Sequence, residues 1–120
     1  MNYKQLTPMF YTSMYDSEFD VGYMVYTFMC GLYPNLKTVE IEVIPTDLTE
    51  DNVFGWTTIN NDQNEIEIHN NLSEKDFITT LIHELIHVDQ NVRGLSDDAE
   101  REAEAYKLEG ILTEKFMTEC

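Results

Sequence analysis

The chain has 120 residues, with 23 acidic and 7 basic side chains, a net charge of −16 and two cysteines. This length predicts a single domain, residues 1–120, built around one core. A surface of that charge repels nucleic-acid phosphates, and no apolar run is long enough to cross a bilayer, so we expect neither a nucleic-acid nor a membrane partner. The lack of a recognisable leader and the low cysteine content predict a cytoplasmic protein.

A helix is predicted in the first third of the chain, after an irregular arm over residues 1–15. Ser17 and Asp20 have the spacing of a capping box, in which each side chain bonds the backbone N–H of the other residue. Apolar residues then recur at helical spacing until Gly31 and Pro34, residue types that end helices. We expect the Met and aromatic side chains of this helix to pack in the core.

Three strands are predicted next. Residues 38–44 alternate apolar and acidic side chains with the period of two that is typical of a half-buried strand, which we expect Pro45 to stop. Residues 53–59 and 65–69 are two further strands joined by a polar turn, and we expect them to pair as an antiparallel hairpin. The predicted sheet is therefore small, three-stranded and mainly antiparallel.

A second helix is predicted from Ser73, its N-cap, to Gly94. Asp76 has the position of the capping-box partner of Ser73, and Arg93 with Gly94 has the cation and glycine that mark a helix end. Apolar side chains recur between these ends at helical spacing: Phe77, Leu81, Ile82, Leu85, Ile86 and Val88. This helix has roughly five turns.

The same helix carries His83, Glu84 and His87 in the pattern H-E-x-x-H. Residues four apart lie on one face of a helix, so both imidazoles can reach a single ion. Neutral imidazole is a preferred ligand of Zn²⁺, and two such ligands leave room for a third ligand and a water. Glu84 lies beside the ion, where a carboxylate can take a proton from that water. The pattern predicts a zinc site with Glu84 as the general base.

A third helix, capped by Asp97, offers the candidates for the third ligand. On a helical wheel Glu102 falls between two apolar clusters, whereas Glu100 and Glu104 project to the opposite, solvated side. The clusters comprise Leu95, Ala99, Ala103 and Tyr106, and Ala105, Leu112 and Phe116. A carboxylate on an apolar face is costly unless it meets a cation, so we expect Glu102 to bind the metal, with Glu109 on the same stripe as the alternative.

Two histidines and a glutamate from the next helix resemble the metal site of the gluzincins, the clan of thermolysin. Residues 83–90 and 101–106 are also similar to the H-E-L-x-H and E-A-E-A-N segments of ImmA/IrrE-type peptidases, and to phage SprT-like metallopeptidase domains. The resemblance covers about residues 53–110. The chain departs from these patterns at Tyr106, where ImmA/IrrE-type sequences have Asn, and in a spacer before the third ligand that is shorter than in thermolysin.

The order of the elements predicts an α+β fold, with helices segregated from a small sheet, and the resemblance implies a minimal zincin. It also implies a zinc metallopeptidase, a hydrolase whose substrate is a peptide or protein. In that clan the strand before the active-site helix lines the cleft and its edge receives substrate backbone, a function that falls here to residues 65–69. SprT-like proteins work on DNA, for which this chain has no basic patch. The acidic charge could serve solubility alone, which is the commoner case, or it could attract a basic protein partner.

Four further residues could assist catalysis or orient a metal ligand. Tyr106, one turn after the expected third ligand, could orient a ligand or donate to an oxyanion, or it could be a buried core aromatic. His69 could polarise the transition state or be a solvated strand-end residue. Asp89 or Asp98 could orient a ligand histidine.

The sequence leaves alternatives open at the site and for the function. Glu102 could form only a surface ion pair with Arg101 or Arg93. The chain could be a non-enzymatic acidic binding protein, of the anti-defence or DNA-mimic type, with structural zinc or none. If it is a peptidase, it could act generally or on one dedicated protein partner.

Overall fold

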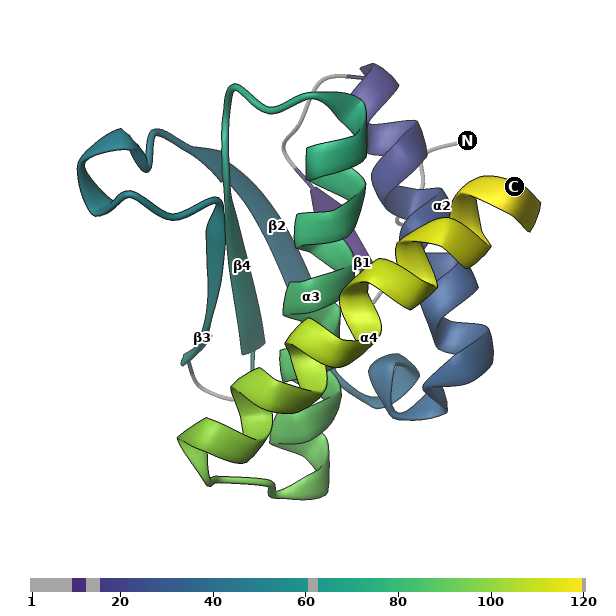
Figure 1. Cartoon of the computed structure of the whole chain (residues 1–120), viewed down its shortest axis with the longest axis vertical. Coiled ribbons are helices and arrows are strands. Elements are labelled where there is room, and N and C mark those ends of the chain that lie inside the picture. Colours follow the sequence, from purple (N-terminus) through teal and green to yellow (C-terminus); the bar gives the residue numbers. More distant parts are fainter. Residues whose placement is uncertain (1–9, 13–15, 61–62, 120) are drawn as a thin grey trace.

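The computed structural model describes residues 10–12, 16–60 and 63–119, which form an α+β arrangement of three α-helices and a mixed sheet (Figure 1). In chain order the elements are β1 (Phe10–Thr12), α2 (Asp16–Leu32), the 3-10 helix η1 (Pro34–Thr38), β2 (Glu40–Thr46), the 3-10 helix η2 (Thr49–Asp51), β3 (Gly55–Asn60), β4 (Gln63–His69), α3 (Glu74–Arg93) and α4 (Asp98–Glu119). The α+β class is confirmed. The expected order of helix, strands, helix and helix is confirmed apart from the short β1, which precedes α2 and makes the sheet four-stranded instead of three-stranded.

The sheet is mixed, so the expectation of a mainly antiparallel sheet was wrong. Its strand order is β1-β2-β4-β3, in which β1 with β2 and β2 with β4 are parallel, and β3 with β4 is antiparallel. The predicted hairpin is confirmed. Because the connection after β2 carries the chain to the far edge, the returning strand β4 enters between β2 and β3 and runs parallel to β2. The short β1 lies in the segment expected to be irregular; the rest of that arm lies outside the described residues.

Strand β2 differs from its prediction at both ends. It begins at Glu40, because the residues before it form η1, and it continues through Pro45 to Thr46. Among the described residues β1 pairs only with residues 41–43, so the one strand seen beside Pro45 is β4, and such a position tolerates a residue without a backbone N–H. The period-two prediction holds, since Ile41 is fully buried between two more exposed glutamates.

Helix α2 begins at Asp16, so Ser17 lies in its first turn instead of at the predicted N-cap. The side chains of Ser17 and Asp20 lie outside the described part of the structure. The helix ends at Leu32, before Pro34, as expected.

Helix α3 has the ends that the sequence predicts. Ser73 Oγ accepts the backbone N–H of Asp76 at 3.2 Å, and Gly94 ends the helix in the left-handed conformation with φ of 76°. The backbone N–H of Leu95 returns to the carbonyl of Gln90 at 3.0 Å, which satisfies one of the last carbonyls of the helix. Because thirteen of its residues are buried, α3 is the central helix of the core, lying along the sheet with α4 crossing it (Figure 1).

The core fills the space between the sheet and the three helices. Its buried apolar side chains come from α2, η1, β2, β4, α3 and α4, and include Val25, Met29, Leu36, Ile41, Ile66, Ile68, Leu81, Leu85, Ala105 and Phe116. Cys30 is a small buried core residue with a free thiol.

Helix α4 is capped as predicted but buries a different face. Asp97 Oδ1 accepts the backbone N–H of Glu100 at 2.9 Å. The buried residues of the helix are Ala105, Leu112, Thr113 and Phe116. The first expected apolar cluster was wrong, because Ala99 and Ala103 are exposed and Tyr106 is 65% exposed. The stripe through Ala105 faces α3, so Tyr106 and Glu102 lie at the margin of the contact.

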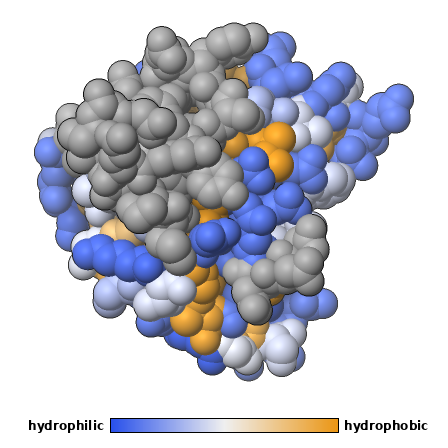
Figure 2. All heavy atoms as spheres, turned by 180° about the vertical axis from the view of Figure 1, so that it is seen from behind, coloured by the Kyte–Doolittle hydropathy of each residue, from blue (hydrophilic) through white to orange (hydrophobic). Residues whose placement is uncertain are grey.

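The outer face of the sheet is acidic. Glu42 and Glu65 are register partners on adjacent strands, and each lies between two buried residues, so they point away from α3. Figure 2 shows the molecule from behind, where hydrophilic side chains predominate among the coloured atoms. Among the described residues, no helix combines the length and apolar character that crossing a membrane requires.

Gly55 brings the edge strand β3 unusually close to α3. A Cβ atom at this position would lie 2.8 Å from the backbone oxygen of Glu67 and 2.8 Å from Cγ2 of Thr80. Both distances are shorter than any ordinary contact, and the first involves backbone that cannot rotate away. Glycine at this position therefore sets the separation between β3 and the helix that carries the H-E-x-x-H residues.

We predict that Gly55→Ala destabilises the protein by about 1–3 kcal/mol, the usual cost of forcing extra atoms into a packed site. Gly110→Ala is the matched control, because nothing lies within 4 Å of a Cβ there and alanine favours the helix by about 0.5–1 kcal/mol. Urea unfolding measures both. Equal midpoints for the two variants would contradict the close approach of β3.

Candidate metal centre

A cleft of about 750 Å³ lies between the edge strand and the two C-terminal helices. Residues 52–57 form one wall, α3 forms the base, and α4 forms the other wall. All three residues of the H-E-x-x-H pattern line the cleft, and so do Glu102 and Tyr106. The cleft therefore gathers these five residues at one place.

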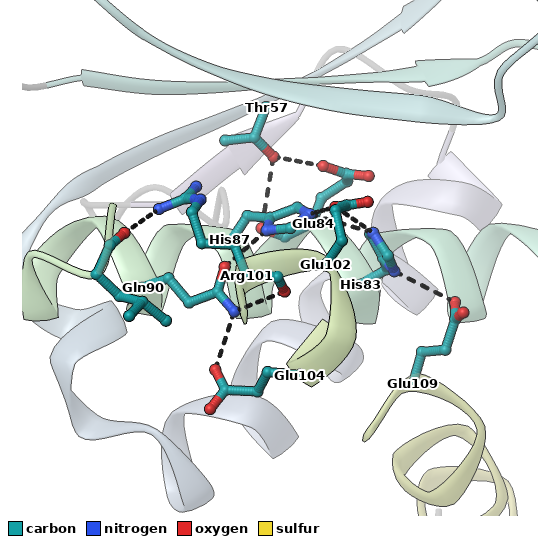
Figure 3. Close-up of polar contacts among 10 residues, drawn as sticks. Thr57, His83, Glu84, His87, Gln90, Arg101, Glu102, Glu104 and Glu109 are labelled. Carbon is teal, nitrogen blue, oxygen red and sulfur yellow. Dashed lines mark hydrogen bonds and ion pairs between the residues drawn. The ribbon is translucent and has the colours of Figure 1, made fainter. Parts of the chain in front are cut away.

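Three side-chain atoms converge in this cleft (Figure 3). His83 Nε2 lies 3.1 Å from His87 Nε2, and Glu102 Oε1 lies 2.7 Å from His87 Nε2 and 3.6 Å from His83 Nε2. Ligands bound to zinc at 2.0–2.1 Å in a tetrahedron are about 3.3 Å apart. The separations of 3.1 and 3.6 Å are close to this value, whereas the 2.7 Å separation is shorter and has the length of a hydrogen bond. The group of His83, His87 and Glu102 could hold a metal ion.

Gln90 fixes the orientation of the His87 ring. Its amide nitrogen donates to the backbone oxygen of Arg101 at 3.0 Å and to Glu104 Oε1 at 2.9 Å. Both partners only accept, so the amide oxygen of Gln90 must face His87 Nδ1, 2.7 Å away. His87 Nδ1 then carries the hydrogen as donor. When the ring is neutral, its Nε2 lone pair points to the other two ligand atoms.

A cation could satisfy all three of these atoms. The lone pair of His87 Nε2 faces a carboxylate oxygen of Glu102, an approach that is repulsive without a proton or a metal ion between the two atoms. It also faces Nε2 of His83, which can donate a hydrogen to it in one tautomer. A proton on His87 would satisfy the contact with Glu102, whereas a metal ion would satisfy all three atoms. The two histidines are each only 9% exposed, so water does little to relieve the repulsion.

The second nitrogen of His83 faces away from this convergence. His83 Nδ1 is buried and has no hydrogen-bond partner among the described residues; its nearest carboxylate oxygen is Glu109 Oε2, at 3.5 Å. Glu109 approaches the ring from the side opposite to Glu102 (Figure 3). Glu109, the alternative third ligand predicted from the sequence, thus lies near Nδ1 of His83 and not near the Nε2 that faces Glu102.

The Tyr106 ring packs edge-on against His83 with centroids 4.9 Å apart, so it is an exposed wall of the cleft and not a core aromatic.

Glu84 is buried beside the two histidines and is held from the sheet. Thr57 Oγ1, on β3, donates to Glu84 Oε1 at 2.7 Å. Burial raises the pKa of Glu84 because it disfavours the charged form, while the Thr57 hydrogen bond and the nearby histidines oppose that rise. A carboxylate whose pKa is raised toward neutrality is a better proton acceptor near pH 7.

Glu104 differs from its prediction, because it is not a freely solvated charge. It accepts from Gln90 and forms an ion pair with Arg93, so it ties α4 to α3. The proposed surface pair of Glu102 also fails to form: Arg93 binds Asp89 and Glu104, and Arg101 donates to a backbone oxygen. The Glu102 carboxylate therefore contacts the two histidines instead of an arginine.

Two residues given possible roles in orienting or polarising groups are engaged elsewhere. Asp89 accepts from Asn35 at 3.2 Å and from Arg93 at 2.8 Å, away from the ligand histidines. His69 Nδ1 accepts the backbone N–H of Leu48 at 3.1 Å and does not line the cleft. Asp98 does line it. The sequence analysis missed Gln90, whose signal is an amide three residues after a ligand histidine on a buried helix.

The strand that faces the cleft is not the one expected. Residues 65–69 belong to β4, which is paired with β2 on one side and β3 on the other, so neither of its edges is free. The edge strand is β3, and its residues line the cleft. Backbone groups on its outer side are the ones available to a ligand.

No protein-family model matches the chain, and comparisons with curated proteins and with solved structures find no match either. The function is therefore argued from the site alone.

We predict that Glu104→Gln lowers stability in a pH-dependent way. The hydrogen bond from Gln90 and the Arg93 pair lower the pKa of Glu104 from its ordinary 4.5, so the ionised form is the one that stabilises the fold. The stabilisation is complete above pH 4.5 and is lost as pH falls through the lowered pKa. Urea unfolding at about pH 7 should show a loss of roughly 0.5 kcal/mol, and this loss should become smaller as the pH falls below 4.5.

Glu100→Gln is the control for the Glu104 variant, because it removes one charge from the exposed side of the same helix. A loss at Glu104 that persists in acid, or equals that of the control, would contradict the assigned contacts.

Proposed function

We propose that this chain is a zinc-dependent endopeptidase of the gluzincin-like kind, with His83, His87 and Glu102 as the metal ligands. The observation that carries the proposal is the convergence of these three atoms in an open cleft, with the Glu84 carboxylate beside them. Two imidazoles and one carboxylate are a donor set typical of catalytic zinc, which keeps a further position for water or substrate.

The chemistry divides between the ion and the chain. Bound zinc would lower the pKa of its water and polarise a carbonyl oxygen. Glu84 takes the proton from the attacking water and passes it to the leaving amine. Thr57 keeps the Glu84 carboxylate turned toward the histidines, and Gln90 keeps the Nε2 of His87 available by holding its Nδ1 hydrogen.

An extended peptide fits the form of this cleft. The free edge of β3 can add a strand through main-chain hydrogen bonds, which ask little of the peptide sequence. Thr57 lies on that strand and contacts Glu84, so a peptide on this edge passes close to the general base. Exposed rings of Phe54 and Tyr106 on the two walls offer apolar contact to substrate side chains.

The charge of the cleft favours a basic substrate. Asp76, Asp98 and Glu109 line it along with the site carboxylates, and Arg101 is the one cation among its lining residues. Arg101 is already bonded to the Leu95 carbonyl oxygen. A positively charged peptide would therefore gain in encounter rate and affinity, in a way that salt weakens.

A second candidate function is an acidic binding protein that cleaves nothing. The paired Glu42 and Glu65 on the outer sheet face support it, because rows of carboxylates are what a DNA-mimicking surface needs. In that case the zinc is structural or absent, and loss of the general base has no effect on the function.

We predict that Glu84→Gln retains zinc but loses 10²-fold or more of peptidase activity, because general-base catalysis is worth roughly that factor or more. The amide oxygen of the variant still accepts from Thr57, so the site keeps its shape. Zinc content is measured on the purified protein, and cleavage on a quenched fluorescent peptide. Glu100→Gln serves as the charge-matched control and should cleave normally; equal activity in the two variants would remove Glu84 from the mechanism.

We further predict that denatured histone, a basic protein, is cleaved faster than denatured casein, an acidic one. Added salt should reduce the difference between the two cleavage rates, which gel assays measure. Loss of a single band from a cell lysate, with both denatured proteins intact, would point instead to one dedicated substrate. Equal rates at low salt would contradict the role assigned to the acidic lining.

A further inference from the structure

His83 has the one buried side-chain polar atom without a hydrogen-bond partner among the described residues. That atom is Nδ1, inside a helix where nearly every neighbour is buried. A buried donor left unpaired costs about 1–3 kcal/mol, so an orphan in the centre of the site requires an explanation.

The two ligand histidines differ in how their second nitrogen is held. Gln90 takes the Nδ1 hydrogen of His87 at 2.7 Å. A metal bound at Nε2 leaves Nδ1 as an N–H donor, and ligand histidines usually give that hydrogen to an oxygen that fixes the ring. His83 therefore needs an acceptor on its Nδ1 side as soon as its Nε2 binds an ion.

Glu109 is the group placed to be that acceptor. Its Oε2 lies 3.5 Å from His83 Nδ1, a few tenths of an ångström longer than a hydrogen bond. The Glu109 side chain is only 22% exposed, against 49% for Glu102, so it points into the cleft. Figure 3 shows the His83 ring between the two carboxylates.

We propose that Glu109 is a positioning residue that accepts the Nδ1 hydrogen of His83 when the metal binds. The inference rests on the metal centre of the proposed function but not on turnover. Glu102 and Glu109 are seven residues apart, which is two turns on one face of α4. The same helix therefore places one carboxylate near each of the two ring nitrogens of His83. The carboxylate also makes the imidazole a stronger ligand, because it stabilises positive charge on the ring.

The test compares zinc affinities, by competition with a chromophoric chelator, for the wild type, Glu109→Ala, Glu109→Gln and Glu114→Ala. Glu114 is exposed on the same helix, so its variant reports the effect of removing one charge. We expect Glu109→Ala to bind zinc about 10–100-fold more weakly than the control variant. Glu109→Gln should recover most of the affinity, because its amide oxygen can still accept.

Cobalt(II) spectra separate positioning from ligation. With Glu109 outside the coordination sphere, the visible bands of Co²⁺-loaded Glu109→Gln should match those of the wild type, whereas Glu102→Gln should shift them. The imidazole N–H resonance of His83 in the zinc-loaded protein should exchange faster with solvent in Glu109→Ala. Circular dichroism of the metal-free variants checks that each one folds.

Three results would overturn the assignment. Glu109→Ala with the affinity of Glu114→Ala removes the positioning role and leaves the proposed function standing. Cobalt bands that shift in Glu109→Gln make Glu109 a ligand instead. Absence of zinc binding in the wild type defeats the metal centre itself, and the inference falls with it.

Discussion

The site depends on one close approach of two imidazole nitrogens and a carboxylate oxygen. His83 Nε2 and His87 Nε2 are 3.1 Å apart on a buried helix, and Glu102 closes the third side. Helix periodicity brings the two rings onto one face, and packing of α4 on α3 supplies the carboxylate. Lone pairs this close repel one another unless a proton or a metal ion lies between them, so the geometry supports the proposal that this group holds an ion.

The chain holds this arrangement with a polar network that joins α3 to α4. Gln90, fully buried, bonds the His87 ring on one side and Glu104 and the Arg101 backbone on the other. Glu104 also forms an ion pair with Arg93. Arg93 pairs in turn with Asp89, which accepts a hydrogen bond from Asn35 in η1. Each of the side chains in this network has a partner on another turn or another helix, which makes the network rigid and specific. The position of Glu102 relative to the histidines is thus set by contacts on the neighbouring turns of both helices.

Local patterns predicted the parts of the site that lie within one helix. The spacing of His83, Glu84 and His87 fixes their faces, and the caps at Ser73 and Gly94 fix the helix around them. The choice of Glu102 agrees with the structure, although one reason for it was wrong, because Tyr106 lies exposed at the cleft instead of in an apolar cluster. What the sequence could not show is pairing across elements: that β4 enters the middle of the sheet, that β3 forms the edge, and that Gln90 reaches α4. These depend on contacts between residues far apart in the chain, for which periodicity carries no signal.

The metal centre is tested by calorimetric titration of zinc into chelator-treated protein, wild type and His87→Ala, with the melting temperature followed in parallel. We expect one ion per wild-type chain, stabilisation of about 4 kcal/mol at a thousandfold excess over Kd, and the loss of both in the variant. Wild-type protein that folds and melts identically with and without zinc, and takes up none, would contradict the proposed metal centre.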